Sequence, residues 1–170
     1  SPKDLLSPFS LPLKEGTLRT GILLCEDSWD ENYHFSPMEM LAAKGISLFL
    51  NLSASPFTLG KNDKRHRMLQ GSLSRLHVPM IYVNRRGLEN NGKTCYTYDG
   101  MTASYDRNGN LLAEARPYED AHSLFSFSSE DRRPESVSPM VPCKEDMLLP
   151  ALRYGVRTFL ESIGQARAVI

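Results

Sequence analysis

The stretch from Gly21 to Trp29 constrains this chain more than any other part of its sequence. The uncharged run Gly21-Ile22-Leu23-Leu24 is typical of a short strand that is buried on both faces of a sheet. Cys25, two acidic residues and the only tryptophan follow directly. Because acidic side chains cannot continue a buried strand, we expect the chain to leave the sheet at Cys25, with a nucleophile at the end of a rigid element. The alternative is a buried structural cysteine.

Composition sets broad limits on the fold and on the partners. The chain has 170 residues, of which 41% are hydrophobic, and this indicates one ordinary domain with room for part of a second. Twenty basic residues balance twenty acidic ones, so we expect neither nucleic acid nor a membrane surface as partner. No apolar run has the length of a membrane span and nothing resembles a signal peptide, which predicts a soluble, cytoplasmic protein.

The three cysteines, Cys25, Cys95 and Cys143, are too far apart for a zinc-binding pattern, and the four histidines are scattered. We therefore expect free thiols in a reducing compartment, histidines that lie at the surface or are held by structural hydrogen bonds, and no metal site.

Residues 1–19 are expected to be an irregular connector, because Pro2, Pro8 and Pro12 break regular structure and residues 14–16 are typical of a turn. The domain proper is predicted for residues 20–127. A helix should begin after Ser36, its N-cap, and continue to about residue 44, followed by a strand at 46–52, a helix at 63–76 and a strand at 80–83. Strands that alternate with helices in this way predict adjacent parallel strands.

A change of pattern follows the strand at 80–83. Residues 85–92 are predicted to form a polar loop, and three short strands are expected at 94–98, 101–105 and 111–115. The dipeptides Asp99-Gly100 and Asn108-Gly109 are typical of hairpin turns and predict an antiparallel meander, completed by a strand at 124–127.

The C-terminal part is predicted to open a second domain. Residues 128–144 should be a linker, and residues 145–170 should contain a helix with Pro150 in its first turn and the start of an apolar strand at 166–170. The predicted apolar face of this helix consists of Leu152, Val156, Phe159, Leu160 and Ile163.

Five motifs, in this order, resemble the carbon–nitrogen hydrolase (nitrilase) superfamily and within it the glutaminase domain of the glutamine-dependent NAD+ synthetases. They are Cys25-Glu26-Asp27-Ser28-Trp29, Asn51 to Phe57 with Gly60-Lys61, Val83-Asn84 with Gly87, Tyr98-Asp99-Gly100, and the helix Ala151 to Arg157. The resemblance covers residues 17–170. It implies an α/β fold that is part of a four-layer α-β-β-α sandwich, followed by a C-terminal helix and the start of a strand from a synthetase domain.

The family resemblance also implies a chemistry. A cysteine attacks the side-chain amide of glutamine, ammonia leaves, water hydrolyses the thioester, and the synthetase domain uses the ammonia to amidate adenylated deamido-NAD. By resemblance Cys25 is the nucleophile, the backbone N–H of Glu26 helps to hold the oxyanion, and Ser55 and Lys61 bind the substrate. It implies no cofactor in this chain, since ATP, Mg and deamido-NAD belong to the synthetase domain, and it implies a homo-oligomer as the assembly of the whole enzyme.

The match is incomplete where the catalytic triad is concerned. The glutamate and lysine of the family's triad precede its cysteine, whereas here only Lys3 and Lys14 precede Cys25, in contexts unlike the family's. The acidic residues after Cys25 would disfavour a thiolate if their carboxylates lie close to it. We therefore expect a fragment of the enzyme that is inactive by itself. The alternatives are a stand-alone nitrilase-family amidase and a degenerate module kept for assembly.

Overall fold

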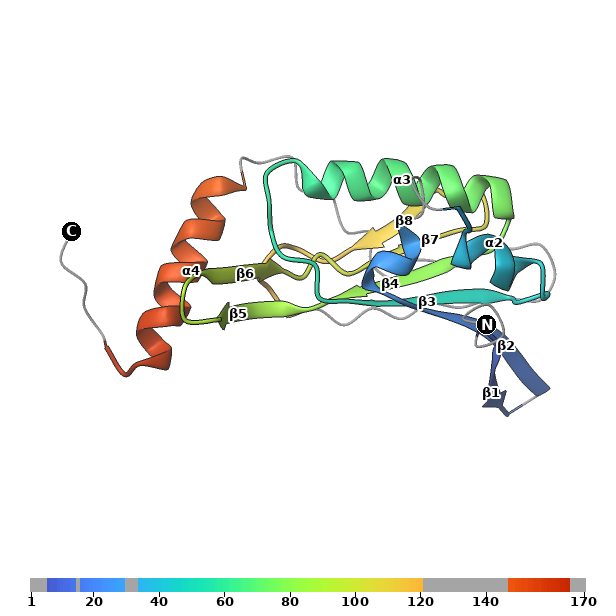
Figure 1. The fold of residues 1–170 in the computed structure, drawn as a ribbon, viewed down its shortest axis with the longest axis horizontal. Coiled ribbons are helices and arrows are strands. Elements are labelled where there is room, and N and C mark those ends of the chain that lie inside the picture. The colour runs from blue at the N-terminus through green and yellow to red at the C-terminus, as the bar shows by residue number, and fades with distance from the viewer. Residues whose placement is uncertain (1–5, 15, 30–33, 121–146, 166–170) are drawn as a thin grey trace.

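The computed structural model describes residues 6–14, 16–29, 34–120 and 147–165. Its centre is a sheet of six strands in the order β1-β2-β3-β4-β7-β8, beside a separate two-stranded ribbon, β5-β6 (Figure 1). The six strands of the sheet are β1 (Phe9–Leu13), β2 (Gly16–Leu24), β3 (Leu48–Ser53), β4 (Met80–Asn84), β7 (Ala103–Tyr105) and β8 (Leu111–Glu114).

The predicted parallel centre is confirmed. Strands β2, β3 and β4 are parallel neighbours, linked through the short helical turn η1 (Cys25–Ser28) and the helices α2 (Pro37–Ala42) and α3 (Lys61–Leu76). Ser36 caps α2 as expected, because its hydroxyl accepts the Glu39 N–H at 3.1 Å.

One face of the sheet packs against α2 and α3. The side chains that alternate toward these helices form the core, in which Leu23, Phe49 and Met80 are fully buried against Leu69 and Leu73 of α3. Gly21 lets α2 and its following loop approach, since a Cβ at this position would lie 2.6 Å from Ile46 Cδ1. Truncating any one of these core side chains to alanine should lower the free energy of unfolding by about 2–5 kcal/mol.

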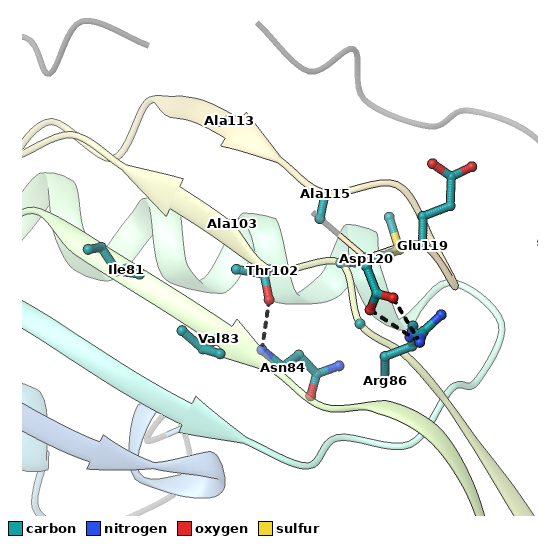
Figure 2. Close-up of a pocket in the computed structure, with 12 residues that line it drawn as sticks. Ile81, Val83, Asn84, Arg86, Thr102, Ala103, Ala113, Ala115, Glu119 and Asp120 are labelled. Carbon is teal, nitrogen blue, oxygen red and sulfur yellow. Dashed lines mark hydrogen bonds and ion pairs between the residues drawn. The ribbon is translucent and has the colours of Figure 1, made fainter. Parts of the chain in front are cut away.

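The opposite face of the sheet is apolar but uncovered among the described residues. Ile22, Leu24, Leu52 and Val83 point to this side and are 39%, 61%, 51% and 40% exposed. The pairs Leu24–Leu52 and Leu52–Val83 are in register on neighbouring strands, so these side chains form one continuous surface. A recess of about 410 Å³ lies on this face beside Ile81, Val83 and three alanines of β7, β8 and the segment after β8 (Figure 2).

The expected connector at residues 1–19 is corrected by the structure in its described part. Residues 9–13 form strand β1, which pairs antiparallel with the first half of β2, with Phe9 opposite Thr20 and Leu13 opposite Gly16. Pro12 is tolerated because β1 is the edge strand of the sheet. How these residues divide into domains stays a prediction.

The predicted meander is correct only in its second half. Strands β7 and β8 are antiparallel around Asn108-Gly109, as expected. The expected polar loop at 85–92 contains instead strand β5 (Arg86–Asn90), which pairs with β6 (Cys95–Asp99) outside the main sheet. Asp99-Gly100 is therefore not a hairpin turn: it is the point where the chain returns from the ribbon, and β7 then pairs with β4.

Helix α4 (Leu148–Ser162) packs across the ribbon at one end of the molecule (Figure 1). Its contacts are made by Ala151, which is buried, by Gly155 against Thr97, and by Tyr154, whose ring stacks on that of Tyr118 at 4.5 Å. Pro150 lies in the first turn, as predicted. The predicted apolar face does not meet the ribbon, since Leu152, Val156 and Ile163 are all more than half exposed. The strands expected at 124–127 and 166–170 and the linker at 128–144 lie outside the described residues.

Candidate active site

Cys25 lies where β2 ends and the turn η1 begins, at the carboxyl edge of the parallel strands. Its backbone is left-handed, with φ of 44°, a conformation that costs a non-glycine residue about 1–2 kcal/mol. The turn is held by two hydrogen bonds: the Leu24 N–H donates to Asp27 Oδ2 at 2.8 Å, and Ser28 Oγ donates to the Cys25 carbonyl at 3.1 Å. The thiol is partly exposed. It therefore leaves the sheet as predicted, and it is not a buried structural cysteine.

Glu26 follows Cys25 inside the same turn, and its side chain is exposed. Its carbonyl accepts the Trp29 N–H at 2.8 Å, which fixes the peptide planes after the cysteine. The Asp27 carboxylate is directed back to the Leu24 N–H.

Ser55 lies on the loop from β3 to α3, as the sequence indicated, and Lys61 follows this loop. Ser55 is 4% exposed, and both its backbone N–H and its carbonyl are bound by the side-chain amide of Asn84. Gly60 has φ of 71° and precedes Lys61, the first residue of α3. The Lys61 ammonium turns back over the loop and donates to the Pro56 carbonyl at 3.0 Å.

The electrostatics connect Lys61 with Cys25. Burial lowers the pKa of the Lys61 ammonium, and the guanidinium of Arg65 lowers it further, whereas Cys25 and Asp99 act in the opposite direction. Burial raises the pKa of the Asp99 carboxyl, opposed first by Arg65 and also by the Asn84 amide and Lys61. Cys25, Lys61, Arg65 and Asp99 therefore share one electrostatic neighbourhood.

Arg65 belongs to the same electrostatic neighbourhood and was not identified from the sequence. Its side chain is 1% exposed, its NH1 donates to Asn62 Oδ1 at 2.7 Å, and its guanidinium lies 4.9 Å from the centre of the Tyr82 ring. The Nε and NH2 groups of Arg65 have no hydrogen-bond partner within the described part of the chain. Helical spacing could have predicted that Arg65 is buried, because it lies three residues before Met68 and four before Leu69, both buried, on the same face of the helix.

On the sheet side, Tyr82 and Ser53 belong to the same neighbourhood. Burial raises the pKa of the Tyr82 phenol, and its hydroxyl lies near Ser53 without reaching hydrogen-bond geometry. Ser53 Oγ instead donates to Asn51 Oδ1 at 2.5 Å.

A second buried polar cluster lies further along α3. The two ring nitrogens of His66 contact the Tyr105 hydroxyl at 2.7 Å and Glu114 Oε1 at 2.8 Å, and Asn62 Nδ2 donates to the same carboxylate oxygen at 2.9 Å. His66 is thus a structural, hydrogen-bonded histidine, one of the two roles expected for it. This cluster ties α3 to β7 and β8, and Asn62 joins it to Arg65, whose NH1 donates to Asn62 Oδ1.

Within the described residues, no group of three histidine, cysteine, aspartate or glutamate side chains is arranged to hold a metal ion. None of the described helices combines the length and the apolar composition needed to cross a lipid bilayer.

Sequence comparison finds relatives over most of the chain, although no protein-family model matches it. The glutamine-dependent NAD(+) synthetase of Synechocystis is 29% identical over 164 residues, which are 90% of this chain and 28% of that protein. The enzyme of the same name from Rhodobacter capsulatus is 26% identical over 168 residues, covering 96% of this chain and 29% of the relative. The chain thus spans less than a third of the length of these relatives.

Solved structures show the same fold. A glutamine-dependent NAD+ synthetase from Acinetobacter baumannii, in complex with ADP, superposes with a TM-score of 0.76 at 22% identity, over 93% of this chain and 28% of that one. A carbon–nitrogen hydrolase from Helicobacter pylori gives 0.53 at 22% identity, over 60% and 38%.

An amidase variant from Nesterenkonia, a structure that shows Michael addition of acrylamide at the active-site cysteine, gives a TM-score of 0.51 at 20% identity, over 65% of this chain and 39% of that one. The expected nitrilase-like α/β fold is therefore confirmed.

Proposed function

We propose that this chain, which is homologous over nine-tenths of its length to a segment of the glutamine-dependent NAD(+) synthetases, carries the cysteine-bearing part of a glutaminase site. The observation that carries the proposal is the strained, partly exposed Cys25 at the carboxyl end of β2, in the electrostatic neighbourhood of Lys61. A thiol on packed core elements is held in a fixed direction, which nucleophilic catalysis requires.

In the proposed reaction, the Cys25 sulfur forms a bond to the side-chain carbonyl carbon of glutamine. The carbon–nitrogen bond then breaks and the nitrogen leaves as ammonia, with a proton supplied by a general acid. Water attacks the resulting thioester, and glutamate and the free thiol are released. An amide is a poor electrophile, so the developing oxyanion needs an aimed donor, a role that we assign to the Glu26 N–H.

Substrate binding is proposed for the loop that follows β3. The Ser55 hydroxyl contacts the amino-acid end of glutamine, and the Lys61 ammonium pairs with its carboxylate. Burial and Arg65 lower the pKa of Lys61, and a nearby anion acts in the opposite direction, as Cys25 and Asp99 do. In this proposal the ammonia serves ATP-dependent amidation of deamido-NAD, and ATP, Mg and deamido-NAD bind to the synthetase part that the relatives possess rather than to this chain.

The amidases and hydrolases of known structure account for 60–65% of this chain, whereas the NAD+ synthetase structure accounts for 93%. This difference favours the synthetase assignment over a stand-alone amidase. We also propose that the 170-residue chain alone releases no ammonia from glutamine, since neither Lys3 nor Lys14 matches the lysine of the family's triad.

The test is the selectivity of cysteine labelling, read by peptide mass spectrometry. Cys95 is exposed and Cys25 is only partly exposed, so iodoacetamide should modify Cys95 faster than Cys25. A chloroketone analogue of glutamine should reverse this order and label Cys25 ahead of Cys95 and Cys143. Free glutamine should slow the reaction of Cys25 alone.

The matched variants are Lys61→Gln and Lys64→Gln, which remove one charge each from the first turn of α3. Lys61→Gln should abolish the reversal, while Lys64→Gln should leave it intact because the Lys64 side chain is exposed and its ammonium is not the one directed to the loop that follows β3. If the chloroketone labels the three cysteines in the same order as iodoacetamide, Cys25 is not part of a glutamine site.

A further inference from the structure

Asn84 and Asp99 end strands β4 and β6, and both belong to motifs whose role the proposed chemistry leaves unexplained. Their side chains meet under the loop that follows β3. Asn84 Oδ1 accepts the Ser55 N–H at 2.9 Å, and Asn84 Nδ2 donates to the Ser55 carbonyl at 3.3 Å and to Asp99 Oδ1 at 3.0 Å. All three residues are at most 5% exposed.

From this geometry we propose that Asn84 and Asp99 are positioning residues for substrate binding: they form a clamp that fixes Ser55 in the orientation in which its side chain meets glutamine. This inference rests on the proposed glutaminase function. It assigns no direct substrate contact to either residue.

The orientation of the Asn84 side-chain amide in this clamp follows from hydrogen-bond chemistry. The Ser55 N–H needs an acceptor and the Ser55 carbonyl needs a donor, so both select the rotamer of Asn84 whose oxygen faces the N–H. The Asp99 carboxylate accepts a hydrogen bond from the Asn84 nitrogen and stabilises the same rotamer. Both backbone groups of Ser55 are then occupied, which leaves the hydroxyl as the group of Ser55 that a ligand can use.

The backbone on either side of the clamp has contacts of its own. The Asn84 N–H donates to Thr102 Oγ1 at 3.2 Å (Figure 2), and the Phe57 N–H donates to the Thr97 carbonyl at 2.8 Å. The loop is therefore anchored at Ser55 by the clamp and at Phe57 by β6. Asp99 also shares the neighbourhood of Lys61, so one buried carboxylate serves both residues that we assign to glutamine.

The test uses Asn84→Asp, Asp99→Asn and the double variant in the full chain, with labelling of Cys25 by the glutamine chloroketone and by iodoacetamide. Asn84→Asp places two carboxylates against each other and removes the donor to the Ser55 carbonyl, while Asp99→Asn replaces the carboxylate that accepts from the Asn84 amide with a neutral, weaker acceptor. We expect each to lower the rate constant for the chloroketone about tenfold, a factor typical of one lost hydrogen bond, with the iodoacetamide rate unchanged. The double variant restores a donor–acceptor pair between the two positions and should recover part of the loss.

Thr102→Val is the matched control, because it removes a hydrogen bond to the Asn84 backbone and leaves the side-chain clamp in place. It should lower thermal stability and leave the ratio of the two labelling rates unchanged. Equal loss with both reagents, or no loss with the chloroketone, would overturn the clamp. A wild-type chain without preference for the chloroketone would overturn the glutaminase proposal itself, and the inference with it.

Discussion

The left-handed backbone of Cys25 has a measurable consequence for stability. A residue with a Cβ at φ of 44° costs about 1–2 kcal/mol, whereas glycine is free of this cost but loses about 0.5–1 kcal/mol more conformational freedom on folding. The difference predicts that Cys25→Gly is more stable than Cys25→Ala by about 1 kcal/mol. Both variants lack the thiol, so the comparison isolates the backbone.

Two other positions of the chain calibrate this comparison. His77 ends α3 with φ of 55° and is exposed, so His77→Gly should also be more stable than His77→Ala by about 1 kcal/mol. Ser74 lies in α3 with an exposed side chain, and there the order should reverse, with glycine less stable than alanine by about 1 kcal/mol. The stability difference between glycine and alanine should therefore change by about 2 kcal/mol from position 25 to position 74.

Urea unfolding of the six variants measures these differences. With a slope of about 2 kcal/mol/M, the Gly–Ala pair at Cys25 should differ by about 0.5 M in midpoint, in the direction opposite to the pair at Ser74. If alanine at position 25 is as stable as glycine, or more stable, then Cys25 is not held in a left-handed turn and the argument for a strained nucleophile is wrong.

Two further predictions concern a turn and a docking contact. Gly109→Ala should lower the free energy of unfolding by about 2 kcal/mol more than Gly92→Ala does. Both glycines have positive φ, but only at Gly109 would a Cβ lie 2.5 Å from a carbonyl oxygen, that of Gln70. Equal midpoints in urea would contradict this close approach. Burial raises the pKa of Tyr118 from 10.0 to about 12, so the stability that this phenol contributes is complete below pH 10 and lost as pH rises through about 12. Tyr118→Phe should make the fall in unfolding free energy over this range shallower, and an unchanged slope would show that Tyr118 is not buried against α4.

The sequence predicted the elements whose pattern is local. Buried apolar runs located β2, β3 and β4, the Ser36 cap located the start of α2, and Asn108-Gly109 located the β7–β8 turn. Each of these signals depends on a few neighbouring residues, and the parallel order then follows from the alternation of strands and helices.

Pairings between distant segments could not be predicted in this way. Strand β5 reads as polar because it forms a ribbon with little burial, and Asp99-Gly100 has the composition of a hairpin turn although β6 pairs backward with β5. The apolar face of α4 was correctly identified as a stripe, but amphipathicity does not say which neighbour covers it, and the ribbon contacts the small residues Ala151 and Gly155 instead.

The site shows the same division. Motif resemblance predicted Cys25, Ser55 and Lys61 as site residues, and this stays a prediction; Cys25 follows β2, Ser55 follows β3 and Lys61 begins α3. It did not assign roles to Arg65, Asn84 and Asp99, because buried polar residues act through partners that are distant in sequence: 29 residues separate Asn84 from Ser55.

The roles that we propose for the site concern substrate binding more than proton transfer. Release of ammonia needs a general acid, and hydrolysis of the thioester needs a general base. Of the groups assigned to the electrostatic neighbourhood of Cys25, Lys61 pairs with the glutamine carboxylate in our proposal, Arg65 cannot give up its proton, and Asp99 is buried behind the Asn84 amide. The proposed reaction therefore assigns proton transfer to none of these three residues, which agrees with our proposal that the chain alone reacts at its thiol without turning over glutamine.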